Sequence, residues 1–511
     1  MKVLETYTLM ADGVPAKVRI ISEEKEFVPI YELQLPKIEP GTQAILGSIR
    51  ERLIAEVRVK AQEILDPKAM EELKDRFFSK SLEFIEREFS RLTSEDRKAL
   101  AGILLHDMLG LGEIEVLLKD DNLEEIVINN SEEPVWVYHK KVGWAKTTLM
   151  MKTETQIYNY ASLVGRKVGR QITTLNPLMD AHLISGDRVN ATLHPISTKG
   201  NTMTIRKFAR NPWTLPDFII NKTINGEVSA LLWLAMQYEL NMIISGGTAT
   251  GKTSFLNVLS TFIQPTQRII SIEDTREIQL PDFMHWVPLT TREANPEGKG
   301  EVSMLDLMIN SLRMRPDRIV VGEIRRAREA EVLFEAMHTG HSVYSTLHAE
   351  TADQTIRRMM NPPIDVPATL LESVHLIAVM HRDRRKKIRR IFEVAEVIAE
   401  KGGEAGIKLN VLYRWRPDTD TIIPYRQSER LIEEIKLYTG MTDQEIKQDL
   451  QGKQKVFEYM IKNGINTINT VGKVVSEYYL NPSVVFEHVR RNLPPDKLLG
   501  EFAREVRGIK K

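Results

Sequence analysis

The chain has no cysteine, so disulfides, thiolate metal sites and cysteine nucleophiles are all excluded. It also lacks an excess of either charge, because 70 Lys and Arg residues balance 70 Asp and Glu residues and the formal net charge is +0. Proteins that bind nucleic acid over a broad surface usually have a basic face or a high pI. The balance therefore argues against such a protein, although it leaves room for a local basic patch.

Long hydrophobic runs are missing as well. No stretch approaches the roughly 20 apolar residues that a helix needs to span a bilayer, and the longest apolar runs, such as residues 231–236, have the size found in protein cores. The N-terminal sequence MKVLETYTLMADG lacks the apolar segment of a signal peptide. We therefore expect a soluble cytoplasmic protein that associates with a membrane only peripherally.

The 511 residues, of which 42% are hydrophobic, are enough for about three domains. Apolar–polar alternation favours strands in the first 40 residues, whereas three-to-four spacing favours helices from about 43 to 110, with a helix start at Thr93. Prolines 212 and 216 indicate a linker. The expected organisation is an N-terminal β extension and helical bundle (1–110), an α+β domain (111–210), a linker (211–216), an α/β domain (217–427) and a helical C-terminal region (428–511).

Short apolar strands alternate with helices between about 225 and 380, a pattern typical of a buried, mostly parallel sheet flanked by helices. We expect these strands at 242–244, 268–272, 318–321, 342–347 and 375–379, and two further strands on either side of Gly402 and Gly403.

A phosphate-binding loop follows the first of these strands. The segment GGTATGKT at 246–253 matches G-x-x-x-x-G-K-[ST], with a strand before it and a predicted helix over 254–263 after it. Glycines let backbone N–H groups turn toward phosphates, and the helix N-terminus adds its positive end. Lys252 can reach the β- and γ-phosphates, and the Thr253 hydroxyl can bind Mg²⁺. The predicted ATP-binding residues are Gly246, Gly247, Thr248, Ala249, Thr250, Gly251, Lys252, Thr253 and Ser254.

Two later strands end in carboxylates. Residues 268–272 lead into Glu273 and Asp274, and residues 319–322 lead into Glu323. Ligands of such sheets bind at the carboxyl ends of the strands, so all three side chains are candidates to face the phosphates. Glu323 suits a Mg²⁺ ligand, and Glu273 suits a general base that positions water. The alternative is that these acids cap the helices that follow the strands.

Three histidines, His338, His341 and His348, lie near the next strand. Their spacing is not that of a metal site, because strand alternation does not bring them together. A single histidine is more often structural, but His348 ends a strand at the same edge of the sheet and is a candidate sensor of the γ-phosphate.

Arginines form two further groups. Arg170, Arg188 and Arg206 precede the P-loop domain, and an arginine supplied across a subunit boundary can stabilise a transferring phosphoryl group, although most arginines are solvated surface groups. Residues 382–390 include seven Lys or Arg. They form either a solvated turn between two strands or a docking site for an acidic partner or anionic lipid.

Four of these stretches, GGTATGKT, IEDTREIQLP, RMRPDRIVVGEIR and TGHSVYSTLHAE, resemble the motifs of the secretion ATPase superfamily, the hexameric motors of type II and type IV secretion and of type IV pili. The upstream GRQITTLNPLMDAHLISGDRVNATLHPIS is similar to the N-terminal domain of that family. Within the superfamily, the whole chain looks most like the archaellum motor ATPase of a thermophilic archaeon.

The resemblance implies an α/β fold with a RecA-like P-loop domain, preceded by an α+β N-terminal domain and a helical bundle. It also implies a homohexamer that binds Mg-ATP between the two domains, with Arg170, Arg188 or Arg206 acting between domains or subunits. Expected partners are a polytopic membrane platform protein and cytoplasmic accessory proteins of a filament machinery. The four-cysteine zinc motif of some relatives is excluded, because the chain has no cysteine.

Three alternatives stay open. The first is the same engine serving a type IV pilus or type II secretion-like export, since the motifs describe the engine and not its load. The second is a nucleic-acid translocase, against which the balanced charge and the lack of nucleic-acid-binding motifs argue. The third is a nucleotide-gated scaffold that does not hydrolyse ATP, against which Lys252, Glu273 and Glu323 argue.

Overall fold

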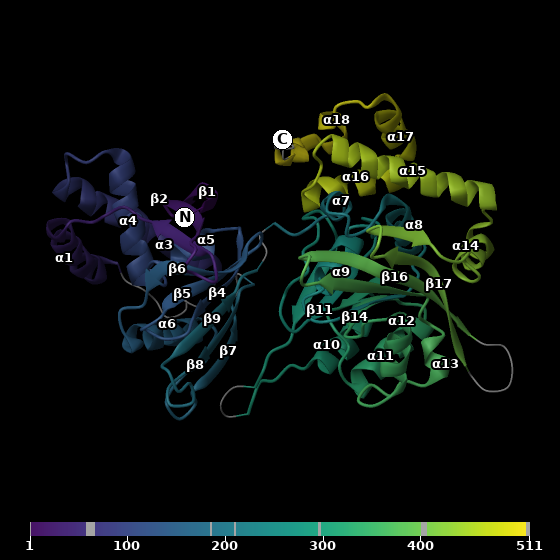
Figure 1. Ribbon diagram of the computed structural model, residues 1–511, viewed down its shortest axis with the longest axis horizontal. Coiled ribbons are helices and arrows are strands. Elements are labelled where there is room, and N and C mark those ends of the chain that lie inside the picture. Colours follow the sequence, from purple (N-terminus) through teal and green to yellow (C-terminus); the bar gives the residue numbers. More distant parts are fainter. Residues whose placement is uncertain are drawn as a thin grey trace. The chain divides into compact units, whose positions relative to one another are not determined.

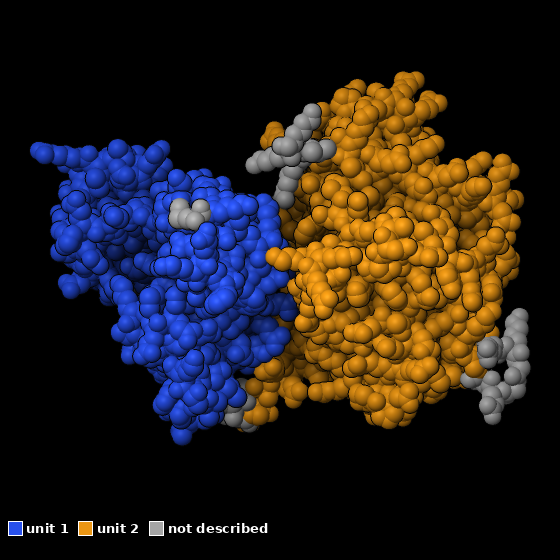
Figure 2. All heavy atoms as spheres, viewed as in Figure 1, with its two compact units in different colours: residues 1–210 blue, residues 211–511 orange. Residues whose placement is uncertain are grey.

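The computed structural model describes residues 2–57, 67–183, 186–208, 211–294, 298–399 and 406–506. It consists of two compact units, which we call the N-terminal unit (1–210) and the C-terminal unit (211–511) (Figure 2). The finer division into five segments stays a prediction.

A nine-stranded sheet forms the N-terminal unit, in the order β1-β2-β3-β6-β5-β4-β9-β8-β7. Only the β3–β6 pair is parallel; the other neighbouring pairs are antiparallel. The first three strands thus continue the sheet of the α+β region, whereas the sequence indicated a separate extension. The strands are β1 (Lys2–Ala11), β2 (Val14–Ser22), β3 (Ile30–Gln34), β4 (Leu123–Ile128), β5 (Pro134–His139), β6 (Gly143–Met150), β7 (Leu178–His182), β8 (Arg188–Thr192) and β9 (Thr202–Arg206).

Burial explains why the first strands join this sheet. Val18, Ile20 and Tyr31 are fully buried and belong to one core with residues of β4 and β5, such as Ile126 and Val137. The strands β6 and β7 were not predicted from the sequence, because Gly143, Lys146 and Asp180 interrupt the apolar alternation that marks a strand.

Helices in the N-terminal unit fall into two groups. The helices α1 (Pro40–Glu56), α3 (Pro67–Glu88) and α4 (Ser94–Leu109) bury one face each in a small core of their own, which includes Leu53, Phe84 and Leu104. The predicted start of α4 is confirmed, since the Thr93 side chain accepts a hydrogen bond from the N–H of Asp96. The helices α5 (Ile114–Lys119) and α6 (Glu154–Lys167) line the sheet's core instead.

The C-terminal unit is built on a second nine-stranded sheet, in the order β12-β11-β13-β14-β10-β15-β16-β17-β18. The pairs from β12 to β15 are parallel and those from β15 to β18 antiparallel. The five strands predicted for the parallel part are confirmed. The strands are β10 (Met242–Gly246), β11 (Ile269–Glu273), β12 (Trp286–Thr290), β13 (Arg318–Val321), β14 (Ser342–Leu347), β15 (Leu376–Asp383), β16 (Ile388–Ala399), β17 (Ile407–Arg416) and β18 (Thr421–Pro424).

Two strands of this sheet, β12 and β18, were not predicted from the sequence. The strand β12 contains Pro288, which cannot donate to a ladder and is tolerated because β12 is an edge strand. The strand β18 is four residues long and lies at the opposite edge. The predicted Gly402–Gly403 turn between β16 and β17 lies outside the described residues.

Helices cover both faces of the parallel part of this sheet (Figure 1). Successive residues of β10 point to opposite faces, so that Ile243 joins one core and Met242 and Ile244 the other. On the Ile243 face lie α10 (Met304–Ser311), α11 (Ala327–His338), α12 (Ala352–Met360) and α13 (Ala368–Leu371). On the other face lie α7 (Leu215–Ile220), α8 (Gly226–Gln237) and α9 (Lys252–Ser260).

The C-terminal helices share the core of this second face (Figure 1). Every residue of α8 from Val228 to Met236 is buried, and a helix that is buried on all sides needs neighbours on all sides. Trp233 of α8 stacks on Phe262 and donates to the hydroxyl of Tyr479. The helices are α14 (Leu431–Thr439), α15 (Asp443–Lys462), α16 (Ile468–Leu480), α17 (Pro482–Arg491) and α18 (Asp496–Leu499).

Among the residues described, no helix combines the length and the apolar character that crossing a membrane requires.

Candidate active site

The carboxyl edge of the parallel sheet collects the side chains that the sequence singled out. The strands β11, β13, β14 and β10 are consecutive neighbours in the sheet. Glu273 ends β11, Glu323 follows β13, His348 follows β14, and the glycine-rich loop follows β10. Because parallel strands end at the same edge, the topology brings these groups together.

The loop between β10 and α9 has the backbone of a phosphate cradle. Ala249 and Gly251 have positive φ angles of 60° and 95°, and Lys252 is the first residue of α9. A Cβ on Gly246 would lie 2.5 Å from Thr250 Oγ1 and 2.6 Å from the carbonyl oxygen of Met380, so only glycine fits there. The helix N-terminus and this turn together form a site for an anionic group.

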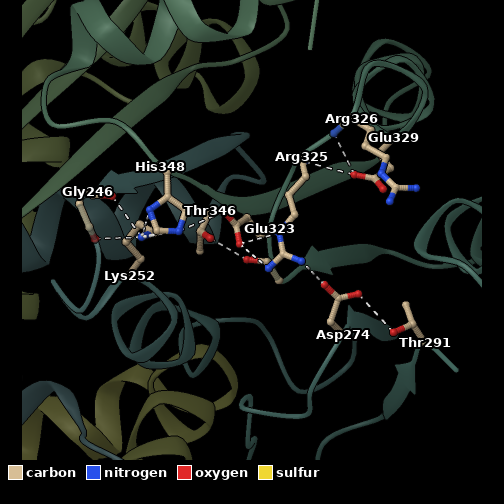
Figure 3. Close-up of polar contacts among 12 residues, drawn as sticks. Gly246, Lys252, Asp274, Thr291, Glu323, Arg325, Arg326, Glu329, Thr346 and His348 are labelled. Carbon is tan, nitrogen blue, oxygen red and sulfur yellow. Dashed lines mark hydrogen bonds and ion pairs between the residues drawn. The ribbon is translucent and has the colours of Figure 1, made fainter. Parts of the chain in front are cut away.

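Lys252 lies inside the loop (Figure 3). Its Nζ donates to the carbonyl oxygens of Gly246 and Gly247 at 3.1 Å each and lies 3.2 Å from Nδ1 of His348. Burial lowers the pKa of the Lys252 ammonium, and the nearby Glu323 carboxylate opposes that shift. Phosphate oxygens are stronger acceptors than these carbonyls, so the ammonium is positioned to bind them.

A chain of polar contacts connects His348 to the end of β11 (Figure 3). His348 Nε2 lies 3.2 Å from Glu323 Oε1, and Arg325 donates to Glu323 Oε2 from Nε at 3.0 Å and from Nη2 at 2.8 Å. Arg325 Nη1 donates to Asp274 Oδ2 at 2.5 Å, and the hydroxyl of Thr291 donates to Asp274 Oδ1 at 3.2 Å. Both carboxylate oxygens of Glu323 are thus oriented by neighbours, and Glu323 does not cap the following helix.

The surroundings of His348 favour the neutral form of its imidazole. Burial lowers the pKa of its imidazole, and the Lys252 charge adds to this, while Glu323 acts in the opposite direction. A neutral ring placed between a cation and an anion can bond to both, which suits a side chain that responds to a phosphate. The histidines His338 and His341 do not join it: His338 is exposed at the end of α11, and His341 contacts Thr339.

Glu273 has a different environment. Its side chain is buried, and Oε1 accepts hydrogen bonds from the N–H groups of Glu277 and Ile278, so this oxygen does cap the turn that follows. Within the described residues, Oε2 is buried without a hydrogen-bond partner. Burial raises the pKa of the Glu273 carboxyl to about 7, although the two backbone hydrogen bonds lower it. A carboxylate with a pKa near neutrality is suited to accept a proton.

Mg²⁺ binding by Thr253 and Glu323 stays a prediction. Thr253 lies half-buried in the first turn of α9, and Glu323 is near enough to Lys252 to counteract the lowering of that ammonium's pKa by burial. Mg²⁺ is commonly held by one or two protein side chains together with substrate phosphates rather than by a full protein cage. No cluster of three or more His, Asp or Glu was found in the described part of the chain that could hold a metal by itself.

Two of the three arginines singled out from the sequence, Arg170 and Arg188, contact Asp180. Arg170 donates to the backbone oxygen of Asp180, and Arg188 pairs with the Asp180 carboxylate through Nε at 3.0 Å. Arg206 lies directly opposite Arg188 in the β8–β9 register. The structure therefore groups all three arginines at one corner of the sheet.

The basic run at 382–390 is a hairpin between β15 and β16. Residues 384–387 are exposed, as expected for a solvated turn. Its end differs: Arg390 is buried and forms a two-pronged ion pair with Asp420 at 2.7 Å, and Arg389 donates to the carbonyl oxygen of Ala249 in the phosphate cradle.

Sequence reasoning overlooked Arg325, Arg389 and Thr346. Arg325 follows Glu323 by two residues, so its position beside the acidic strand end was a signal that could have found it. Thr346 donates to the carbonyl oxygen of Gly322 and fixes the turn that carries Glu323. Arg389 is 140 residues from Ala249, and no local pattern marks such a contact.

Comparisons with known proteins place the chain in a family. Residues 112–471 match the family model described as "Type II/IV secretion system protein". The "uncharacterized protein MJ0900" of Methanocaldococcus jannaschii is 34% identical over 409 residues, which cover 79% of this chain and 73% of that protein. The "type IV secretion system protein PtlH" of Bordetella pertussis is 28% identical over 325 residues, covering 59% of this chain and 92% of PtlH.

Among solved structures, the ATPase DotB of Legionella pneumophila is 17% identical, with a TM-score of 0.41, and covers 74% of this chain and 95% of DotB. The family model spans well over half of the chain and includes the phosphate cradle and the acidic strand ends. This protein therefore belongs to the type II/IV secretion system ATPase family.

Proposed function

We propose that this protein is a Mg²⁺-dependent ATP hydrolase that works as a homohexamer on the cytoplasmic face of the membrane and powers assembly of an archaellum filament. The observation that carries the ATPase part is the row of Lys252, His348 and Glu323 at the ends of adjacent strands, bridged by contacts of 3.2 Å (Figure 3). The archaellum part rests on the sequence resemblance and on the archaeal relative.

The proposed residue roles follow from the geometry. The loop from Gly246 to Ser254 binds the phosphates, with Lys252 exchanging its carbonyl partners for the β- and γ-phosphate oxygens. Thr253 and Glu323 hold Mg²⁺, which supplies positive charge to the phosphate oxygens when bound. His348 reports the γ-phosphate to Glu323, because its two ring nitrogens face Lys252 and that carboxylate.

Glu273 serves as the base in this proposal. The oxygen of a water molecule attacks the γ-phosphorus, the bond to the bridging oxygen of ADP breaks, and the water's proton passes to the Glu273 carboxylate. The unpartnered Oε2 and the pKa near 7 support this role. The products are ADP and inorganic phosphate.

Arg170, Arg188 and Arg206 are proposed to act on a nucleotide bound by the C-terminal unit of a neighbouring subunit or of their own. Partners in this proposal are a polytopic membrane platform protein and cytoplasmic accessory proteins, with anionic lipid as an additional contact; nucleic acid is not a partner. Binding-driven closure of the two units would transmit force to that platform.

Steady-state ATPase activity tests the enzymatic part. We expect the wild-type protein to hydrolyse ATP only with Mg²⁺. Its turnover should rise with the fraction of hexamer, which size-exclusion chromatography measures at the same protein concentrations. Lys252→Ala and Glu323→Ala should each lower kcat at least about 100-fold, since each removes a charge placed at the reacting phosphate. Turnover that survives in both variants would contradict the assigned site.

A second candidate load is supported by the family match and by PtlH, whose name assigns it to type IV secretion. The same engine would then drive pilus assembly or protein export. Deletion of the gene, scored for swimming, surface adhesion and secreted protein in parallel, separates the loads. Loss of swimming with intact adhesion supports the archaellum, and loss of adhesion or export with intact swimming rejects it.

A further inference from the structure

The hairpin of β15 and β16 extends beyond the end of the P-loop strand. Gly246, the last residue of β10, is paired with Met380 of β15. The strand β15 continues to Asp383, and Arg382 is paired with Arg389 of β16. At about 3.3 Å per residue, Arg389 is level with a point roughly 7 Å past the end of β10. That is the region into which the phosphate cradle extends.

Arg389 contacts the cradle in two ways. Its Nε donates to the carbonyl oxygen of Ala249 at 3.2 Å. Its Cδ would lie 3.5 Å from a Cβ placed on Gly251, so the aliphatic part of the side chain covers the glycine that precedes Lys252. Ala249 has a φ of 60°, an uncommon value for a residue with a side chain. The hydrogen bond from Arg389 thus helps to hold the loop in this conformation.

The rest of the guanidinium is available for a ligand. Within the described residues, Nη1 and Nη2 of Arg389 have no hydrogen-bond partner, and the side chain is partly exposed. Its neighbour Arg390, by contrast, is fully engaged by Asp420 and two backbone oxygens. A guanidinium with free donors beside a phosphate cradle matches the planar, two-oxygen geometry of a phosphate.

We propose that Arg389 is a nucleotide-binding residue, which fixes the P-loop through Ala249 and presents its Nη groups to the phosphate chain of the bound nucleotide. The nucleotide site therefore includes Arg389 at the end of the basic hairpin, whereas the exposed residues 384–387 form a surface turn. This inference rests on the proposed ATPase function and adds to it a residue that lies outside the four family motifs quoted above.

Arg389→Met tests the proposal, because methionine keeps the aliphatic cover over Gly251 and removes every donor. The Kd for ADP and the KM for ATP should each rise roughly tenfold or more, the loss expected for a charged hydrogen bond, while kcat changes less than about twofold. Arg389→Lys keeps the positive charge but loses the planar guanidinium. Its Kd for ADP and its KM for ATP should lie between those of Arg389→Met and the wild type. The matched control is Arg384→Met, an exposed residue of the same hairpin, which should leave both constants unchanged.

Melting curves of all variants establish that they fold equally. Wild-type-like Kd and KM values in Arg389→Met would overturn the inference while leaving the proposed function intact. A fall in kcat at unchanged KM would overturn it too, because the residue would then act on the chemical step. Wild-type protein that binds no ADP would instead overturn the proposed function together with this inference.

Discussion

At the carboxyl edge, the charged side chains of Glu323, Arg325 and Asp274 are partners of one another. Glu323 is the centre of this arrangement, with His348 on one oxygen and Arg325 on the other. Arg325 also binds Asp274, so it connects the ends of β13 and β11. A carboxylate that is proposed to hold a metal is usually oriented by such a neighbouring group.

Replacing Arg325 with alanine should therefore weaken Mg²⁺ use. Glu323 would lose two hydrogen bonds, and we expect the Mg²⁺ concentration for half-maximal ATPase activity to rise about 10- to 100-fold. The measurement is a Mg²⁺ titration of activity at saturating ATP. Arg328→Ala removes the same charge from an exposed position of α11 and should have no effect. An unchanged Mg²⁺ titration for Arg325→Ala would contradict the positioning role.

The raised pKa of Glu273 leads to opposite pH trends for activity and stability. As the proposed base, Glu273 must be deprotonated, so kcat should fall about tenfold per pH unit below the pKa of about 7 and level off above it. Stability runs the other way: the folded-state pKa is higher than the usual 4.5, so the carboxyl's contribution is fully present below about pH 4.5 and is lost as pH rises through 7.

A pH profile of kcat for the wild type, together with melting temperatures of Glu273→Gln, checks both trends. The variant should be inactive at every pH. The melting temperature of the variant minus that of the wild type should be a few degrees larger at pH 8 than at pH 5. Glutamine cannot ionise, so the variant does not lose stability as the pH rises through 7. A flat wild-type profile between pH 6 and 8 would exclude Glu273 as the base.

Among the elements, α8 determines how the C-terminal helices attach. Lys453 of α15 is fully buried beside this helix, paired with Asp449, and lies 5.4 Å from the ring of Trp233 and 5.0 Å from that of Tyr478. Burial lowers the pKa of this ammonium to about 8. The buried Lys453 ammonium needs the Asp449 carboxylate as its partner. The pair therefore fixes the register of α15 against α8 and α16.

Breaking this pair on one side should destabilise the C-terminal unit. Lys453→Met leaves the Asp449 carboxylate without its cation, and we expect the free energy of unfolding in urea to fall by about 3–5 kcal/mol. The double variant Lys453→Met with Asp449→Asn should recover a large part of that loss. Lys455→Met, at an exposed position of the same helix, should change it by less than about 0.5 kcal/mol. Equal stability of the single variant and the wild type would show that the pair is dispensable.

For the whole molecule, the proposal places catalytic groups of different subunits at one site. Arg188 is exposed on β8, is paired with Asp180 and lies opposite Arg206. If it acts on a neighbour's nucleotide, Arg188→Ala should lower kcat by roughly 10³-fold or more. Mixing this variant with Lys252→Ala should then restore measurable activity, because some interfaces combine an intact Arg188 with an intact Lys252.

The mixing experiment is read as specific activity across mixing ratios, with each inactive variant alone as the control. Restored activity that peaks at intermediate ratios supports action between subunits. Activity that stays at the level of the separate variants at every ratio would place Arg188 with its own subunit's nucleotide or outside the site.

Local pattern was sufficient for much of this molecule. The strands β10, β11, β13, β14 and β15, the start of α4 at Thr93 and the P-loop were all predicted, because hydrophobic periodicity, helix capping and glycine spacing are properties of neighbouring residues. The placement of Glu273, Glu323 and His348 at one edge also followed from the chain, since parallel strands share a direction.

Local sequence patterns did not predict the contacts between segments that are far apart in the chain. Which surfaces meet after folding decides how β1–β3 join the later strands and how α8 shares a core with α15 and α16. It also decides the Arg389–Ala249 contact and the contacts of Arg170 and Arg188 with Asp180. The sequence by itself thus determined the elements and the chemistry at each strand end. Only the tertiary structure decided which charges pair and where the arginines lie, because pairing depends on distances in space that sequence separation does not specify.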